Sequence, residues 1–233
     1  VSLLDANTAA GEAVRAAFEQ MYGAENVLFL PCDVTSEAQL KDSFSKTLER
    51  FQRLDMVCNN AGIYEEGNWE KCISVNLVSV IKGTYLGLEY MSKETGGAGG
   101  VIVNVASMAG LIPFITGPVY AASKHGVVGF TKSLALSCVE KHGVRVNALC
   151  PIFVDTMLLC DVKLVEKFVD LKEELQELIA TIGVVQPSQV AEGFWQLVSD
   201  QSRNGALLKV LAEGKLEYEV QPQGLPAATH KHT

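Results

Sequence analysis

Short apolar runs alternate with longer stretches of helical periodicity along most of this chain. The apolar runs have strand length and fall at residues 1–4, 27–30, 54–58, 101–105, 144–149 and 206–211. Between them, apolar residues recur at helical spacing and predict helices over residues 8–22, 36–52, 68–93, 120–136, 161–181 and 188–199. This alternation predicts βαβ units, and therefore an α/β fold with a doubly wound, mostly parallel sheet. We expect one domain over residues 1–211 and a loosely ordered tail over residues 212–233.

Polar or loop-forming residues follow the predicted strands. They are Asp5, Asp33, the segment Asn59–Gly62, Ser107 and the loop that Pro151 opens. In parallel sheets ligands bind outside the carboxyl ends of the strands, close to the point where the strand order reverses. The alignment of these residues along one edge therefore predicts a cleft for a nucleotide-type ligand.

The stretch from Ser107 to Lys124 carries the clearest candidate chemistry. Tyr120 and Lys124 are four residues apart, so on a helix they share a face. A nearby cation favours the phenolate, which would lower the pKa of the tyrosine and make it a usable base. Ser107, just after a predicted strand, could place a hydroxyl donor beside that phenol. Such a set can deprotonate an alcohol or polarise a carbonyl, although a lone Tyr/Lys pair at this spacing is usually a solvated surface pair.

Composition narrows the class of protein. The chain has 233 residues, 48% of them hydrophobic, a net charge of -8 and a pI of about 5.1. These values predict one sizeable core and argue against nucleic acid or an anionic membrane surface as the main partner. Six scattered cysteines without a Cys-x-x-Cys pair predict a reducing, cytoplasmic compartment, and the four histidines form no ligand cluster that would indicate a metal site.

Four pieces of the sequence together resemble the short-chain dehydrogenase/reductase family. They are Asn59-Asn-Ala-Gly62, Asn76, Ser107 and Tyr120-x-x-x-Lys124, and the resemblance extends over nearly the whole chain. It implies a Rossmann-type fold in which Tyr120 is the general base, Lys124 lowers the pKa of Tyr120 and holds the nicotinamide ribose, Ser107 binds the substrate oxygen, and Asn76 positions a water in a proton relay. By itself, Asn76 could equally cap a local bend.

The same resemblance implies a set of residues that bind the cofactor. Asp33 and Val34 would border the adenine, Asn60 the ribose, and Val154 to Thr156 the nicotinamide amide, so that the full expected set is Asp5, Asp33, Val34, Asn60, Tyr120, Lys124, Val154 and Thr156. A carboxylate at Asp5 could accept hydrogen bonds from a ribose diol and would repel a 2′-phosphate, which favours NAD over NADP. Alternatively, Asp5 or Asn7 merely caps the next helix.

Within the family, residues 76–93 and 118–131 are similar to the NAD-dependent prostaglandin dehydrogenases. This similarity implies oxidation of a secondary, allylic hydroxyl of a prostaglandin or related oxylipin to a ketone by a cytoplasmic homodimer. An apolar acid would suit a site bordered by Leu111, Ile112, Phe114, Ile115 and Phe153. The same residues could instead pack the core or a dimer.

The sequence departs from the family in three places. The usual first strand and its Thr-Gly-x-x-x-Gly-x-Gly turn are absent, and we expect that upstream residues are missing from this sequence. Without that strand, its two neighbours should lie about twice the normal spacing of ~4.8 Å apart and leave backbone groups unpaired. Gly117 replaces a glutamine that helps to bind the substrate hydroxyl in the prostaglandin enzymes. Ile152 replaces a glycine beside the nicotinamide.

Two other interpretations stay open at this stage. The first is a non-catalytic relative or truncated isoform that acts through its dimer helices and binds NAD poorly. The second is a serine hydrolase that uses Ser107 with His125, although the sequence lacks the Gly-x-Ser-x-Gly turn of many such enzymes.

Overall fold

The computed structural model of the chain describes residues 1–159 and 172–220, in which two main sheets of mostly parallel strands are separate from each other. The smaller sheet pairs β1 (Ser2–Asp5) with β2 (Leu28–Pro31). The larger has the order β3 (Met56–Asn59), β4 (Gly100–Val105), β5 (Val144–Pro151), β8 (Leu207–Val210), β9 (Leu216–Tyr218). All neighbours are parallel except β9, which runs antiparallel to β8. A short pair, β6 (Phe153–Val154) and β7 (Val184–Val185), lies outside both sheets.

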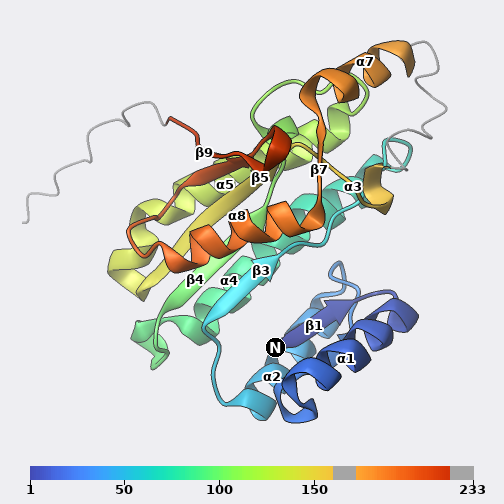
Figure 1. The fold of residues 1–233 in the computed structure, drawn as a ribbon. Coiled ribbons are helices and arrows are strands. Elements are labelled where there is room, and N and C mark those ends of the chain that lie inside the picture. The colour runs from blue at the N-terminus through green and yellow to red at the C-terminus, as the bar shows by residue number, and fades with distance from the viewer. Residues whose placement is uncertain (160–171, 221–233) are drawn as a thin grey trace, which may run out of the picture.

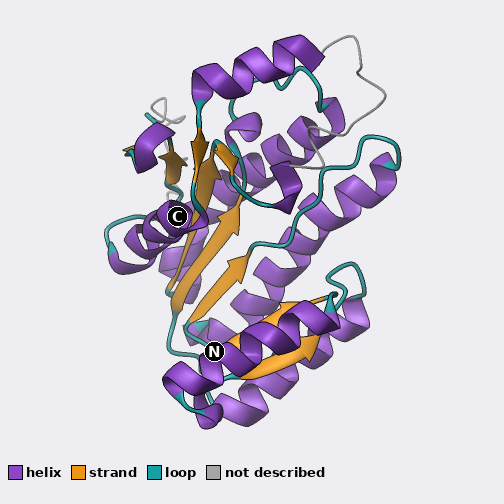
Figure 2. Cartoon of the chain, turned by 45° about the vertical axis from the view of Figure 1, so that its right-hand side comes forward, coloured by secondary structure: helices purple, strands orange, loops and turns teal. Residues whose placement is uncertain are grey.

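The expected interruption of the sheet is present. Among the described strands, β1 is hydrogen-bonded only to β2, and β3 only to β4. Figure 1 places β1, α1 and α2 in a group of their own beside the main sheet, and Figure 2 shows the same two groups of strands from another side. The two halves of the predicted sheet are therefore not joined by backbone hydrogen bonds.

Helices cover both faces of the five-stranded sheet, as a doubly wound fold requires. The α-helices are α1 (Thr8–Tyr22), α2 (Glu37–Phe51), α3 (Trp69–Ile73), α4 (Ser79–Met91), α5 (Pro118–His142), α7 (Lys172–Ile182) and α8 (Pro187–Ser199), and 3₁₀ turns span Ala24–Asn26, Lys93–Thr95, Met108–Gly110 and Ala212–Gly214. Helices α4 and α5 lie behind the sheet and α8 in front of it (Figure 1). Successive side chains of β4 alternate accordingly, because Ile102 packs in the cluster with Leu86 of α4 while Val101 and Val103 pack with Leu197 of α8.

Side-chain caps set the first residues of two helices. Asn7 Oδ1 accepts a hydrogen bond from Ala10 N (3.1 Å), and Ser36 Oγ accepts one from Gln39 N (3.4 Å). The capping-box pattern of Ser36 and Gln39 is only half formed, because Gln39 Oε1 accepts from Asp33 N (2.8 Å). Gln39 therefore ties the helix to the loop after β2 and not to its own cap residue.

The long helix predicted over residues 68–93 is interrupted. A π-helical turn, Ser74–Val78, separates α3 from α4 and holds one residue more than an α-turn does. Asn76 lies within this turn and is buried. The hydrophobic pattern gave no sign of the extra residue, since both flanking segments are helical.

The tail expected after residue 211 is partly ordered, which corrects the predicted domain boundary. Residues Leu216–Tyr218 form β9, whose backbone pairs with Leu208 to Val210 of β8. Gly214 adopts a positive φ of 77°, which suits the reversal between the two strands. Residues 221–233 of that tail, and residues 161–171 of the helix predicted over 161–181, lie outside the described part.

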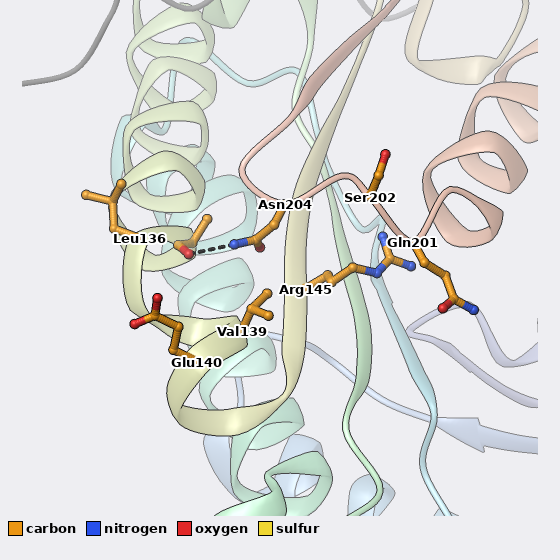
Figure 3. Close-up of a pocket in the computed structure, with 8 residues that line it drawn as sticks. Leu136, Val139, Glu140, Arg145, Gln201, Ser202 and Asn204 are labelled. Carbon is orange, nitrogen blue, oxygen red and sulfur yellow. Dashed lines mark hydrogen bonds between the residues drawn. The ribbon is translucent and has the colours of Figure 1, made fainter. Parts of the chain in front are cut away.

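Arg145 on β5 closes the end of α8 beside a surface pocket of about 280 Å³ (Figure 3). Its Nη1 donates to the carbonyls of Leu197, Asp200 and Arg203, each at 3.0 Å, and its Nη2 donates to that of Val198 at 2.8 Å. The last carbonyls of a helix have no hydrogen-bond donors within the helix. The guanidinium of Arg145 provides donors for these carbonyls at the end of α8. Desolvation lowers the pKa of Arg145 from its ordinary value.

Replacing Arg145 by methionine should lower the free energy of unfolding by about 3 kcal/mol, because several half-buried carbonyls lose a charged donor. Urea denaturation measures the loss. Arg53→Met is the matched control, since Arg53 pairs with Asp55 at 2.7 Å on the surface and both side chains are more than half exposed. Equal losses in the two variants would show that Arg145 stabilises no more than a surface ion pair.

Candidate active site

Ser107, Tyr120 and Lys124 meet as the sequence predicted. Tyr120 and Lys124 lie in the first two turns of α5, and the Lys124 Nζ is 5.7 Å from the centroid of the Tyr120 ring. Ser107 follows β4, where its Oγ accepts from Ala109 N (3.1 Å), and its hydroxyl lies close enough to Tyr120 to favour the phenolate. Lys124 Nζ donates to the carbonyl of Val105 at 2.9 Å, so the end of β4 holds both partners of the tyrosine.

Burial dominates the ionisation of both catalytic candidates on α5. It raises the pKa of Tyr120 to about 12, although the nearby Ser107 hydroxyl opposes the rise. It also lowers the pKa of Lys124 to about 8. The lowering of the Tyr120 pKa that we expected from Lys124 is therefore not found in this arrangement. The desolvation penalty of the phenolate is larger than the stabilisation that neighbouring groups give it.

Asn76 turns its amide towards the loop that follows β3. Its Oδ1 accepts from Ile63 N (2.8 Å), and its Nδ2 donates to Ile63 O (2.9 Å) and to Ser123 Oγ (3.2 Å). An ideal Cβ at Gly62 would lie 3.5 Å from Lys124 Nζ and 3.6 Å from Asn76 Oδ1. The absence of a side chain at Gly62 thus leaves these two groups facing the same small space.

Aromatic rings enclose the phenol of Tyr120. Its ring centroid lies 5.5 Å from that of Tyr64 and 6.3 Å from that of Phe114, and the Phe114 centroid lies 5.9 Å from that of Phe153. The aliphatic residues of the same cluster include Leu158, Leu175 and Ile179. Of the apolar residues expected at the site, Phe114 and Phe153 contribute to this wall. Leu111 packs against a separate core cluster, while Ile112 and Ile115 are exposed.

Two residues of the loop after β3 belong to the site although no motif in the sequence distinguishes them. Tyr64 donates its hydroxyl to the carbonyl of Thr116, and Glu66 accepts hydrogen bonds from the backbone of α5 at Val119 and Tyr120. An available signal was Gly117, which stands at the N-cap of α5 without a side chain that could cap the helix. An ideal Cβ at Gly117 would approach Tyr64 Cε2 to 2.8 Å, so Tyr64 occupies the space of a longer residue there.

Except for Asn60, the residues expected to hold the adenosine end of a cofactor lie at the small sheet. Asp5 ends β1, and its Oδ1 accepts from Asn7 N (2.7 Å). Asp33 follows β2 and accepts from Thr35 N (2.9 Å) and Thr35 Oγ1 (2.7 Å), which holds its pKa below the usual range. Val34 packs against the core, and Asn60 is exposed after β3. The alternative capping interpretation holds for Asn7, while Asp5 makes an additional bond to it.

The residues expected beside the nicotinamide follow β5. Val154 lies in β6, and Thr156 N donates to its carbonyl at 2.8 Å. Ile152 N donates to the carbonyl of Val210 at 3.0 Å, and its side chain is buried in the core with β8. The isoleucine is therefore accommodated by packing away from Tyr120. Among the described residues, no group of three or more His, Cys, Asp or Glu side chains is arranged to hold a metal ion.

The hydrolase interpretation finds no support in the geometry. His125 lies on α5, where its Nδ1 is 2.9 Å from the carbonyl of Ala121 one turn earlier. The titratable group beside Ser107 is Tyr120, which is protonated at neutral pH and therefore cannot take the proton of the serine as a histidine would.

Comparison with known proteins assigns the chain to a family. A family model described as "short chain dehydrogenase" matches residues 1–167. The chain belongs to the short-chain dehydrogenase family. It is 43% identical to 15-hydroxyprostaglandin dehydrogenase [NAD(+)] of Mus musculus over 95% of this chain and 85% of that protein. It is 44% identical to the enzyme of the same name from Homo sapiens over 94% of this chain and 84% of that protein.

Two solved structures share the fold. Levodione reductase superposes with a TM-score of 0.79 at 29% identity and covers 90% of this chain and 85% of its own. The structure named ElxO with NADP bound gives a TM-score of 0.73 at 26% identity, with 90% and 86% covered. The mostly parallel α/β fold of this short-chain dehydrogenase is thus confirmed. No helix in the described part of this family member is both long and apolar enough to cross a membrane.

Proposed function

We propose that this short-chain dehydrogenase oxidises a secondary, allylic hydroxyl of a prostaglandin or related oxylipin to a ketone, with NAD as cofactor and Tyr120 as general base. The observation that carries the proposal is the meeting of Ser107, Tyr120 and Lys124 beside an aromatic and aliphatic wall. The identity of 43–44% to enzymes named for this reaction supports the substrate class.

The chemistry of the donor groups suits a nicotinamide dinucleotide. Asp5 uses Oδ1 to accept from Asn7 N, and within the described residues its Oδ2 receives no hydrogen bond, so that it could accept from a ribose diol. Asp33, Val34 and Asn60 would hold the adenosine end, while Tyr120, Lys124, Val154 and Thr156 would hold the nicotinamide end. When bound, NAD would supply the hydride acceptor.

Residues of the chain would bind the substrate oxygen and transfer the proton of the hydroxyl. Ser107 would donate to the substrate oxygen, and Tyr120 would take the proton of the hydroxyl. In this structure Tyr120 has a pKa of about 12 and is protonated at neutral pH; the positive charge of Lys124 is the group on α5 that would favour its phenolate. Asn76 and Lys124 face the space beside Gly62, where a water could carry the proton away from Tyr120.

The outer faces of α4 and α5 would form a homodimer interface. Tyr85 on α4 is 53% exposed and packs edge-to-face on Phe130 of α5 with ring centroids 5.8 Å apart. Leu136 and Val139, further along α5, are 86% and 41% exposed. Exposed aromatic and aliphatic residues grouped in this way are typical of protein interfaces.

A second candidate is a non-catalytic protein that acts through this dimer face. The separation of β1 from β3 favours it, because the residues for the two ends of NAD then lie on sheets that no backbone ladder joins. Titration with NADH distinguishes the two functions, since only the dehydrogenase requires binding.

A direct test compares a prostaglandin that has an allylic secondary hydroxyl with its analogue saturated at the adjacent double bond. We expect NADH formation from the allylic alcohol at a kcat/KM at least about tenfold higher, because conjugation favours the ketone product and the apolar wall binds the chain. NADPH formation from NADP under the same conditions should be much slower, owing to Asp5. NADH binding without oxidation of either alcohol would refute the proposed substrate class.

A further inference from the structure

Helix α5 begins without a side-chain cap of its own. Gly117 occupies the N-cap position, and Pro118 at the next position has no N–H to satisfy. The first free donors of the helix are the backbone N–H groups of Val119 and Tyr120. Glu66, more than 50 residues earlier in the chain, accepts both of them, with Oε2 at 3.0 Å from Val119 N and Oε1 at 2.8 Å from Tyr120 N.

Packing explains why the cap comes from a distant loop. A Cβ at Gly117 would lie 2.8 Å from Tyr64 Cε2 and 2.9 Å from Phe114 Cδ1, so a capping side chain there would collide with both rings. Tyr64 in turn donates its hydroxyl to the carbonyl of Thr116. The segment from Tyr64 to Glu66 therefore holds the chain on both sides of Gly117.

We propose that Glu66 is a positioning residue for Tyr120, an inference that rests on the proposed function. Its carboxylate binds the backbone of the tyrosine itself, at the helix end where a negative charge is electrostatically favoured. Lys124, one turn later, is fixed independently because its Nζ binds the carbonyl of Val105. Fraying of the first turn would therefore move the phenol relative to Lys124 and Ser107 while leaving those two groups in place.

The experiment compares Glu66→Gln and Glu66→Ala with Glu65→Gln. Glutamine at position 66 keeps one acceptor oxygen, and alanine keeps none. Glu65 is a matched control on the same loop, also half-buried, whose Oε1 accepts from Gly67 N (2.7 Å) and Asn68 N (3.0 Å) of that loop. Three readouts are taken: kcat and KM, amide hydrogen exchange at Val119 and Tyr120, and the NMR signal of Tyr120 in protein labelled at the tyrosine Cζ, assigned with Tyr120→Phe.

We expect the Glu66 variants to lose about 10-fold (Gln) and about 100-fold (Ala) in kcat, with the KM for NAD nearly unchanged. Exchange at Val119 and Tyr120 should accelerate and the Tyr120 signal should shift, whereas Glu65→Gln should change none of the three. Faster exchange with wild-type kcat would overturn the proposal and leave Glu66 a structural cap. Unchanged exchange would overturn it as well.

Failure of the proposed function would look different. In that case the wild-type protein itself would turn over no substrate. The exchange rates and the Tyr120 signal would then still decide whether Glu66 positions Tyr120, because neither needs activity.

Discussion

Replacing Tyr120 by phenylalanine is expected to lower kcat by about 1,000-fold, within the range that a general base contributes. The reason is local. The phenol is the group that would take the substrate proton, and Phe retains the ring contacts with Tyr64 and Phe114. Because the ring remains and only the hydroxyl beside Ser107 is lost, the free energy of unfolding should change by less than about 1 kcal/mol. NADH absorbance gives the rate, and thermal denaturation gives the stability.

The neighbouring tyrosine offers the matched control. Tyr64→Phe removes a hydroxyl from a ring 5.5 Å away, but that hydroxyl binds Thr116 and is not placed to accept a substrate proton. Its kcat should stay within about fivefold of wild type. NADH titration of both variants should give nearly unchanged affinity. Wild-type turnover in Tyr120→Phe, or an equal loss in Tyr64→Phe, would remove Tyr120 from its proposed role.

Replacing Lys124 by methionine is expected to stabilise the protein at pH 7 by about 2 kcal/mol while abolishing turnover. Lys124 is 3% exposed, and burial lowers its pKa from 10.5 to about 8. That shift corresponds to about 3 kcal/mol of destabilisation of the protonated form, at about 1.4 kcal/mol per pKa unit. The lost hydrogen bond to Val105 O offsets about 1 kcal/mol of the gain.

Varying the pH tests the sign of the stability change expected for Lys124→Met. Between about pH 8 and pH 10.5 the folded Lys124 has released its proton and the unfolded one has not, so stability should rise with pH over this range in the wild type. The advantage of Lys124→Met should therefore shrink between pH 7 and pH 9.5. Tyr120 works in the opposite direction only above about pH 10, since its folded pKa is raised to about 12 and stability falls as pH rises towards that value.

Urea denaturation at several pH values measures this difference. Lys41→Met is a suitable control, because Lys41 pairs with Glu37 at 2.7 Å and both side chains are more than half exposed. It should bring no stabilisation. A gain at Lys124 that did not depend on pH would show that the buried charge is not its cause. Stabilisation upon loss of Lys124 would mean that the protein retains an unfavourable charge for its chemistry.

Much of the fold follows from local signals. The predicted helix over residues 8–22 agrees with α1 at both ends, because Asn7 caps its start and Gly23, with a positive φ of 87°, ends it. The proximity of Ser107, Tyr120 and Lys124 could be predicted from the sequence, because Ser107 follows a strand while Tyr120 and Lys124 share a helix face. This prediction needs only the helical repeat and the position of Ser107 at the carboxyl end of a parallel strand.

Other features depend on contacts that no local pattern encodes. Glu66 reaches α5 from more than 50 residues away, and its role is visible only when the two segments pack. The pKa of Tyr120 was predicted to fall and is raised, since spacing indicates a neighbouring cation but not how deeply the phenol is buried. The strand Leu216–Tyr218 lies in a region of glycine and charged residues, and it forms because β8 offers a free edge.

The number of residues in the π-helical turn Ser74–Val78 determines the direction of the Asn76 side chain. Each residue of a helix advances the chain by about 100° around its axis, so the extra residue sets α3 and α4 out of phase by that angle. Deleting one residue within the turn would let a continuous α-helix form, with every residue type at the site unchanged. The amide of Asn76 would then rotate away from Ile63 and Ser123. In related proteins, insertion or deletion of one residue in this turn would therefore disconnect the proposed relay. An alignment of the catalytic residues alone would not reveal that loss, because every one of those residues would still be present.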